Sequence, residues 1–478
     1  MALEDEKYAI ETPYDAFICY NEWATERLKV QIITDFVYEY PDDGYETERG
    51  VYIAEDVTPH TEVFSIPLDS TFTFKCLEKN EVLQRMAFFQ QLTLEQEDDQ
   101  LALALLYEKY IQGSKSTWFT HIKVLPTTYH NVLYFEQDQL RALQGSNLFS
   151  IAQQMEEKVA EDYRRLKESV LLELFEKVKE AIDFDKFGEF FSFDNYKWAL
   201  STIWSRFVSL RLDEALPLLE EEHGLMEENR TLMMESINGL TAKQSFKAMV
   251  PVFDMLNHDP EAEMSHFFDT ASQRFKLVSY QHWNAGAQMF INYGPLSNHK
   301  LLSLYGFVII GNQYDAVEMW LPMDEGSTKL FEEKEHLLLT SGLDHATNPF
   351  ELVADESNDL LLIAARVQEI DCETAEEFEA LAKRALDGEM VSIENEQVAL
   401  TRLIYTLEKM LEAFPTSIEE DDKLLESWKN DQGEQSAEPS ESLNHEWMAV
   451  VVRRSDKYIL TENINMLKWK LLDILPTK

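Results

Sequence analysis

The fold of this chain is decided by two stretches, PVFDMLNHD at Pro251–Asp259 and FINYGPLSNHKLLSLYGFVIIGN at Phe290–Asn312. In the first, the polar pair Asn257-His258 follows an apolar run. In the second, Tyr293 ends a predicted strand just before a turn. Taken singly, the pair could cap a helix or turn, and the tyrosine could be a core aromatic with its hydroxyl at the rim. The order DxxNH, IxYG and then LxxxYGF with a following Asn is far more specific than any one part.

The hydrophobic pattern around these stretches predicts strands on both sides of a helical block. Alternating or β-branched runs predict strands at 51–57, 62–67, 275–280, 288–293 and 317–321. Apolar residues at helical spacing predict helices at 101–111, 151–182 and 196–212. The β material is therefore expected to be split by a helical insertion at about 90–245.

The pattern after residue 326 is helical to the end of the chain. Leu400, Leu403, Leu407 and Met410 lie on one face of a long amphipathic segment. The polar stretch Asn430–His445 lacks aromatic residues, which predicts a mobile loop. We therefore expect a separate helical domain.

The composition indicates an acidic globular protein. Of 478 residues, 45% are hydrophobic and 12% aromatic, which allows two or three compact units. The 88 acidic residues give a net charge of -46 and are spread among apolar ones, unlike those of a disordered chain. Such a charge repels phosphate backbones and attracts basic proteins, although solubility alone explains it equally well.

The sequence predicts no metal site and no membrane span. Three scattered cysteines cannot form a four-cysteine zinc site or a disulfide framework, and the histidines lie in no zinc-binding motif. The acidic N-terminus resembles no signal or transit peptide, and no stretch of about 18 uncharged apolar residues occurs. We therefore expect a cytoplasmic or nuclear protein.

Together the motifs resemble the SET-domain protein methyltransferases, specifically the Rubisco large-subunit lysine methyltransferase-like subfamily. The resemblance extends to RGVYIAEDVTPHTEVFSIP (49–67), STWFTHIKVLP (116–126), YKWALSTIWSRF (196–207), FPTSIEEDDKLL (414–425) and VVRRSDKYIL (451–460). It implies an α+β fold, with a β-rich SET core split by a helical insertion and followed by an all-α substrate-binding domain. We place the SET domain at 1–325 and the helical domain at 326–478.

The resemblance also implies S-adenosyl-L-methionine as cofactor and a protein nitrogen as acceptor. Methyl transfer from a sulfonium to an amine is an in-line displacement, so positioning in a dry channel outweighs acid-base work. Tyr293 would be catalytic and would also touch the cofactor, orienting the amine and stabilising charge. Asn257 would bind the amino or carboxylate end of the cofactor, and the backbone around His258 its adenine. Arg206 would pair with the carboxylate.

Further cofactor contacts are implied at two other places. Arg49, Gly50 and Tyr52 would approach the cofactor through backbone groups, because a glycine permits close approach. The family usually has Gly-x-Gly at this turn, whereas Glu precedes Arg49 in this chain. Tyr305 and Phe307 would close the cofactor and lysine channel with their aromatic faces.

Three functions remain open. The first is a lysine methyltransferase acting on a non-histone protein, such as a ribosomal or translation protein, because the cysteine-rich flanks of histone-directed SET enzymes are missing. The second is a histidine methyltransferase, since one branch of the subfamily modifies actin. The third is an idle SET fold that serves as a binding module, which the lost glycine allows. We expect a protein substrate, no nucleic-acid or membrane partner, and a monomer.

Overall fold

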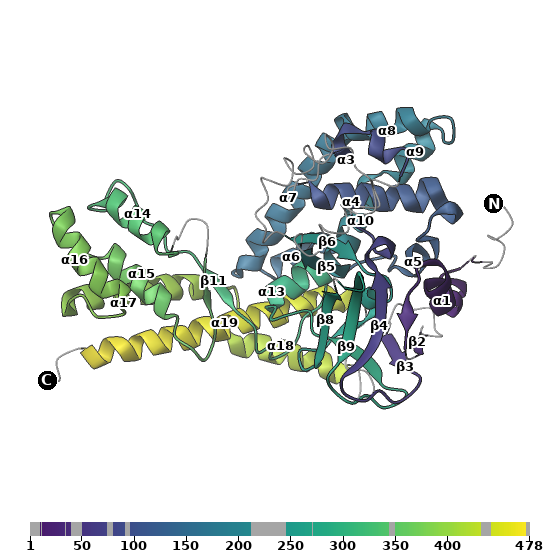
Figure 1. The fold of residues 1–478 in the computed structure, drawn as a ribbon. Helices are drawn as coiled ribbons and strands as arrows, with labels where there is room; N and C mark the ends of the chain where they lie inside the picture. The colour runs from purple at the N-terminus through teal and green to yellow at the C-terminus, as the bar shows by residue number, and fades with distance from the viewer. Residues whose placement is uncertain are drawn as a thin grey trace. The chain divides into compact units, whose positions relative to one another are not determined.

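The computed structural model describes residues 10, 12–33, 35–39, 50–73, 80–90, 96–211, 245–269, 271–343, 349–431 and 441–474. Its contacts divide the chain into two compact units (Figure 1). The first unit comprises residues 1–129 and 156–295, and the second comprises 130–155 and 296–478. These units are defined by contacts within the fold, whereas the boundary that we placed after residue 325 separates two domains along the sequence. That boundary stays a prediction.

Three small sheets form the β part of the first unit. An antiparallel sheet has the order β1 (Gln31–Ile32), β4 (Thr61–Pro67), β9 (Arg274–Ser279), β8 (Met264–Asp269). A mixed sheet has the order β2 (Phe36–Glu39), β3 (Gly50–Ile53), β10 (Gln288–Ile291), β7 (Asn257–His258). The third sheet pairs β5 (Phe207–Arg211) with β6 (Ser245–Met249).

The strand pattern follows from alternate burial. In β9, Phe275, Leu277 and Ser279 are fully buried, and the residues between them are half-buried. β4 departs from alternation because the register with β9 shifts between Glu62 and Phe64, a bulge that leaves four consecutive residues buried. The predicted strands at 62–67, 275–280 and 288–293 are therefore present, each with ends shifted by a residue or two.

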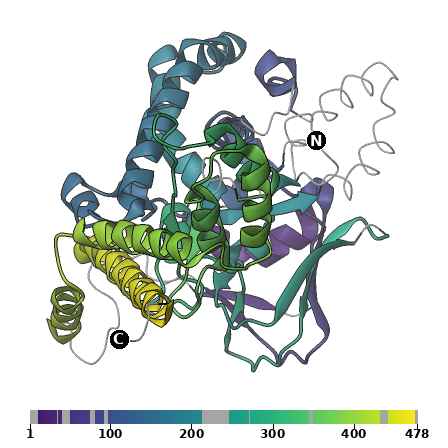
Figure 2. The same ribbon diagram turned by 90° about the vertical axis from the view of Figure 1, so that its left-hand side faces the viewer.

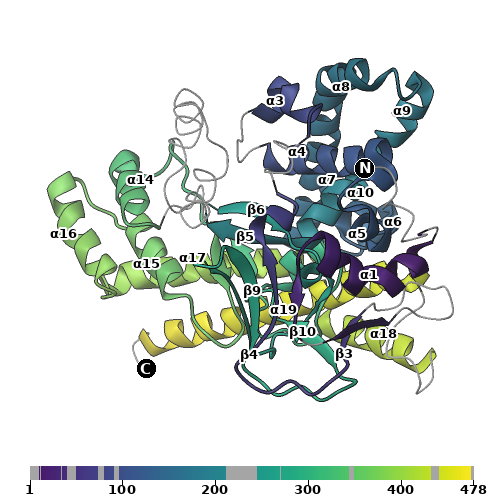
Figure 3. The same ribbon diagram turned by 45° about the vertical axis from the view of Figure 1, so that its right-hand side comes forward.

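The helices of the first unit include the predicted insertion. They are α1 (Pro13–Arg27), α3 (Ala87–Gln90), α4 (Glu97–Leu106), α5 (Phe119–Val124), α8 (Val170–Val178), α9 (Phe184–Phe190) and α10 (Phe193–Arg206). Short 3-10 or π turns lie at 68–70, 83–85, 107–112, 113–115 and 253–255. α10 packs against α4 (Figure 3). α7 (Asn147–Glu168) contains the boundary between residues 155 and 156.

The predicted helix at 196–212 ends earlier than expected. α10 stops at Arg206, and Phe207 has an extended backbone with ψ 151°. Residues 207–211 then pair with β6, with Val208 and Leu210 buried. The prediction of helix beyond Arg206 was wrong because a partner strand about 40 residues away overrides the local propensity. Arg206 therefore stands at the junction of a helix and a strand.

The second unit is mostly helical, as predicted. Its elements are η5 (Val132–Tyr134), α6 (Gln137–Arg141), α13 (Asn298–Lys300), η7 (Leu301–Tyr305), β11 (Val317–Met319), α14 (Phe331–Thr340), β12 (Phe350–Leu352), α15 (Asp359–Gln368), α16 (Ala375–Leu386), α17 (Ile393–Glu412), α18 (Ile418–Asp431) and α19 (Glu441–Ile474). α19, yellow in Figure 2, packs along α17. No helix within the described ranges is both long and apolar enough to cross a membrane.

The predicted apolar face of α17 lies in the core of this unit. Leu400, Leu403 and Leu407 are completely buried, and Met410 packs against the same cluster. Each fully buried leucine stabilises the fold by roughly 1.5–3 kcal/mol. The strand β12 was not predicted, because three residues that pair with β11 give no periodic signal.

The predicted loop at Asn430–His445 is partly helical. α18 continues to Asp431 and α19 begins at Glu441, while residues 432–440 lie outside the described ranges. A second apolar cluster joins α19 to the segment 130–155 through Val132, Leu148 and Met448. This contact explains why that segment belongs to the second unit although it precedes most of the first in sequence.

The motifs at 414–425 and 451–460 bind each other. Asp421 is completely buried, and its carboxylate lies 2.7 Å from Arg453 Nη2 and 2.6 Å from Lys457 Nζ. Burial alone would raise the pKa of Asp421, but hydrogen bonds from Arg453, Lys457 and Thr416 outweigh it and lower the pKa. These motifs therefore form one buried ion cluster between α18 and α19.

Candidate active site

A strained turn precedes the Asn257-His258 pair. Val252 has φ 78° and ψ -54° and leads into η6 (Phe253–Met255). Positive φ is rare for a β-branched residue and is usually maintained by surrounding contacts at functional sites. The Val252 N–H donates a 3.2 Å hydrogen bond to the hydroxyl of Tyr20, and the Val252 side chain is buried. A residue of α1, Tyr20, therefore stabilises the conformation of this turn.

Strand pairing brings the two decisive stretches together. β7 pairs in parallel with β10, so that Asn257 lies opposite Phe290 and His258 opposite Ile291. Tyr293 follows β10 by two residues. Sequence positions 36 apart therefore meet at one end of a sheet, as the resemblance to the SET-domain methyltransferases implied.

Tyr293 is held at three points. Its hydroxyl donates to the main-chain carbonyl of Leu256 over 2.7 Å, and its N–H donates to Nδ1 of His258 over 3.0 Å. The rings of His258 and Tyr293 stack with centroids 4.9 Å apart. Burial, the largest effect, lowers the pKa of His258, which keeps the imidazole neutral and able to accept. These three contacts give the Tyr293 side chain one defined orientation.

A glutamine links Asn257 to the β3 strand. The Asn257 side-chain amide donates to Gln288 Oε1 over 2.9 Å, and Gln288 Nε2 donates to the Tyr52 hydroxyl over 3.1 Å. Gly50 lies against this pair, since a Cβ there would come within 2.8 Å of Gln288 Cδ and of the Tyr52 ring. A side chain at position 50 would therefore displace Gln288 or Tyr52. The approach of Gly50 to the cofactor stays a prediction.

Arg206 meets the same turn from α10. Its Nη1 donates to the main-chain carbonyl of Asp254 over 2.5 Å and lies 3.9 Å from the Asp254 carboxylate. The side chain is 14% exposed, and its Nε is buried without a hydrogen-bond partner among the described residues. A guanidinium with an unsatisfied N–H is suited to bind a carboxylate.

The first unit thus brings together Gly50, Tyr52, Asn257 and Tyr293, and Arg206 contacts the turn that leads to them. Arg49 and the preceding Glu lie outside the described residues. Neither carboxylate oxygen of Asp254 has a hydrogen-bond partner within the described ranges. Tyr305 and Phe307 belong to the second unit, with ring centroids 6.2 Å apart. Their place in a cofactor site stays a prediction.

Sequence reasoning missed Gln288 and Leu256. Gln288 is one polar residue in a strand and carries no motif, and Leu256 acts through its carbonyl, which every residue has. Only the strand pairing identifies them.

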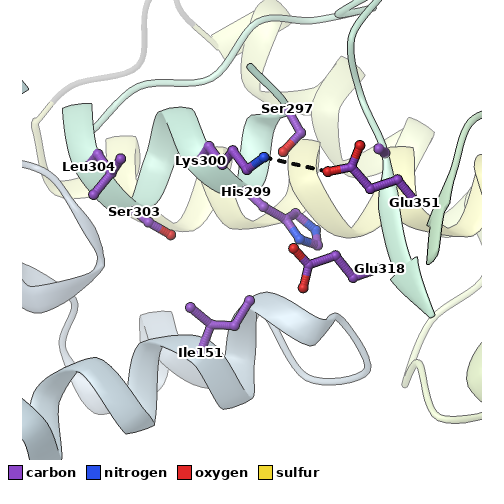
Figure 4. A pocket seen from close by; sticks show the side chains of 9 residues that line it. Ile151, Ser297, His299, Lys300, Ser303, Leu304, Glu318 and Glu351 are labelled. Carbon is purple, nitrogen blue, oxygen red and sulfur yellow. Dashed lines mark hydrogen bonds and ion pairs between the residues drawn. The ribbon is translucent and has the colours of Figure 1, made fainter. Parts of the chain in front are cut away.

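The second unit contains a separate pocket of about 240 Å³, and Figure 4 shows it. It is lined by Ile151, Ser297, His299, Lys300, Ser303, Leu304, Ala316, Glu318 and Glu351. Lys300 and Glu351 form an exposed ion pair of 3.5 Å at its edge. None of the residues that we predicted for the site lines this pocket.

The polar cluster behind this pocket is structural. Ser146 Oγ and both carboxylate oxygens of Asp456 approach the same nitrogen, Nε2 of His299, at 3.3, 2.8 and 3.0 Å. A nucleophile, base and orienting acid would use both ring nitrogens. Burial lowers the pKa of His299, but Asp456 outweighs it and raises the pKa. His299 is therefore a buried partner of Asp456.

Comparison with known proteins supports the architecture. Residues 325–460 match the Rubisco LSMT substrate-binding family. Actin-histidine N-methyltransferase of Danio rerio is 24% identical over 441 residues, covering 90% of this chain and 64% of the relative. The same-named protein of Drosophila melanogaster is 29% identical over 224 residues, covering 46% and 37%. The chain spans less than two thirds of the length of these relatives.

Solved structures show the same fold. Rubisco LSMT bound to sinefungin and monomethyllysine superposes with a TM-score of 0.71 at 19% identity, covering 97% of this chain and 94% of that one. Rubisco LSMT bound to AdoMet gives 0.69 at 20% identity, covering 96% and 93%. The predicted α+β fold class, and the resemblance on which it rests, are confirmed.

Proposed function

We propose that this chain is an S-adenosyl-L-methionine-dependent protein methyltransferase. It has the Rubisco LSMT fold and a match to the Rubisco LSMT substrate-binding family. The observation that carries the proposal is the Tyr293 hydroxyl, bound to the Leu256 carbonyl beside Asn257 at the meeting of β7 and β10. The family resemblance assigns this phenol to methyl transfer.

The residues of the first unit fit the cofactor. Its amino-acid end carries a carboxylate, and Arg206 has a buried Nε that lacks a partner among the described residues. A carboxylate bound there would form a charge-assisted hydrogen bond. Asn257 offers a side-chain amide, held by Gln288, to the polar end of the cofactor. Rubisco LSMT bound to AdoMet has the same fold, which supports this assignment.

S-adenosylmethionine supplies an electrophilic methyl group on a sulfonium. The contribution of the chain is orientation. Because the Tyr293 proton is engaged by Leu256, the phenol oxygen can accept an N–H of the incoming amine and align its lone pair. The neutral His258 ring fixes the Tyr293 main chain, so this acceptor keeps its direction.

The acceptor that we propose is a lysine on a non-histone protein. The structure of Rubisco LSMT with monomethyllysine supports lysine. Histidine is the second candidate, because the curated relatives of this chain are named actin-histidine N-methyltransferases. The net charge of -46 favours a basic protein surface as the partner. A monomer in the cytoplasm or nucleus remains our expectation.

Calorimetry tests the cofactor site. Wild type should bind S-adenosylmethionine with a Kd in the micromolar range or tighter, and Arg206→Ala should weaken binding at least about tenfold, or roughly 1.4 kcal/mol. The control is Arg141→Ala, which removes an exposed ion pair with Asp138 on α6. Failure of well-folded wild type to bind would defeat the enzyme proposal and favour an idle SET fold.

Labelling identifies the acceptor. Extract from cells that lack the protein is incubated with purified enzyme and tritiated cofactor, and mass spectrometry locates the methyl group. Methyllysine supports the first candidate and methylhistidine the second. A labelled protein with neither residue modified would contradict both.

A further inference from the structure

Three side chains from three elements form a buried cluster behind the candidate active site. Tyr20 of α1, His121 of α5 and Asp254 of η6 expose between 0% and 9% of their surface. The Tyr20 hydroxyl lies 2.5 Å from His121 Nδ1, and His121 Nε2 lies 3.0 Å from Asp254 Oδ2. The ring of Trp23 lies parallel to the imidazole, with ring centroids 6.5 Å apart and an interplanar angle of 9°. The imidazole of His121 therefore lies between the Tyr20 hydroxyl and the Asp254 carboxylate.

The Asp254 carboxylate needs compensation. Its side chain is completely inaccessible, and an unpaired buried carboxylate costs several kcal/mol. Two nitrogen-bearing side chains lie within 4 Å of this carboxylate in the part of the chain that the structure describes, the His121 imidazole at 3.0 Å and the Arg206 guanidinium at 3.9 Å. Because His121 is the nearer, it carries most of the compensation.

This arrangement leaves the Nε–H of Arg206 for a ligand, while a hydrogen bond with Tyr129 also engages the guanidinium. Its Nη1 binds the Asp254 main-chain carbonyl instead of the carboxylate, and its Nε lacks a partner within the described residues. Without the imidazole, the Asp254 carboxylate would attract the guanidinium more strongly. Arg206 would then turn away from the cofactor.

Tyr20 connects the cluster to the phenol. Its hydroxyl accepts the Val252 N–H and so supports the positive φ of that residue. Val252 is the N-cap of η6, and its C-cap is Leu256, whose carbonyl accepts the Tyr293 hydrogen bond. A shift of the turn would therefore move the phenol.

We infer that His121 and Tyr20 are positioning residues for methyl transfer: His121 compensates Asp254 so that Arg206 can bind the cofactor carboxylate, and Tyr20 fixes the turn that aims Tyr293. This inference rests on the proposed function. In this inference His121 and Tyr20 contact neither the substrate nor the cofactor, and they act through Arg206 and Tyr293.

The first experiment uses the protein without cofactor. His121→Phe keeps a ring but removes both nitrogens, and it should lower the unfolding midpoint of wild type by about 3 °C or more. In a protein that also carries Asp254→Asn, the same substitution should cost clearly less, because no buried charge then needs compensation. If the decreases in unfolding midpoint from His121→Phe and Asp254→Asn simply add, His121 does not compensate the Asp254 charge.

The second experiment measures S-adenosylmethionine affinity by calorimetry. His121→Phe should raise the Kd about tenfold, and adding Asp254→Asn should restore most of the affinity because the carboxylate no longer attracts Arg206. A purely structural role predicts a further loss instead of rescue. If wild type binds no cofactor, the proposed function fails while the first experiment still decides the compensation. If wild type binds and the double variant is not rescued, the inference fails.

The third experiment separates Tyr20 from general packing. Tyr20→Phe should slow single-turnover methyl transfer to the labelled acceptor about tenfold, with a smaller change in cofactor Kd. Tyr163→Phe on α7 is the control, since the Tyr163 hydroxyl also forms one hydrogen bond with the main chain, which it donates to the Phe191 carbonyl over 2.8 Å. Equal effects of the two substitutions would overturn the role of Tyr20.

Discussion

The hydroxyl of Tyr293 donates a 2.7 Å hydrogen bond to the main-chain carbonyl of Leu256, the residue immediately before Asn257. One contact thus joins the IxYG motif to the DxxNH motif. Because the acceptor is a backbone atom, its position depends on the η6 turn and not on the identity of residue 256. The geometry of the phenol is therefore a property of the turn.

Tyr293→Phe should remove most turnover and leave cofactor binding intact. Phenylalanine keeps the stacking on His258 but loses the oxygen that orients the amine. We expect the single-turnover rate to fall at least about a hundredfold, with the S-adenosylmethionine Kd within about threefold of wild type. A fully active variant would remove Tyr293 from the mechanism.

Gly50→Ala should weaken cofactor binding. The added Cβ would lie 2.8 Å from Gln288 Cδ, so Gln288 must move and release the Asn257 amide. We expect a Kd increase of about tenfold in calorimetry. Gly188→Ala is the matched control, because nothing lies within 4 Å of a Cβ there. Equal affinity in both variants would show that the Gln288 contact does not position Asn257.

His258 should titrate below its ordinary pKa of 6.5. Burial disfavours the imidazolium, and Nδ1 already accepts the Tyr293 N–H. The folded pKa is lowered, so the unfolded chain takes up the proton first and stability falls as the pH drops below 6.5. NMR of labelled histidine and tyrosine should show the Tyr293 amide shifting with the His258 ring. An amide that does not follow this titration would contradict the hydrogen bond.

Asp421→Asn should destabilise the second unit by about 3 kcal/mol at neutral pH, because Arg453 and Lys457 would lose their buried counterion. The control Asp422→Asn removes a half-exposed pair with Arg454 and should cost less than about 1 kcal/mol. The folded pKa of Asp421 lies below the ordinary 3.8, so its contribution is present above that pH and disappears as the pH falls through the folded pKa. Denaturant unfolding at several pH values measures this. A pH-independent difference between wild type and Asp421→Asn would contradict the ion cluster.

The sequence by itself determined the order of the main elements and predicted the principal site residues. Apolar periodicity predicted α17 and its buried leucines, and alternation predicted β9 and β10, because both patterns are local. The motif order indicated that Asn257 and Tyr293 belong to one site. Local patterns carry this information because a helix or strand buries one face wherever it lies.

Only the tertiary structure decided where α10 ends, which atom holds the Tyr293 hydroxyl, and which side chains contact Asn257, Val252 and Asp254. Each depends on a partner distant in sequence: β6 for Phe207, the Leu256 carbonyl for Tyr293, and α5 for Asp254. The residue type does not show whether its backbone carbonyl accepts a side-chain hydrogen bond or whether its side chain is buried. These features arise when strands pair and a carboxylate is removed from water, so the folded chain alone specifies them.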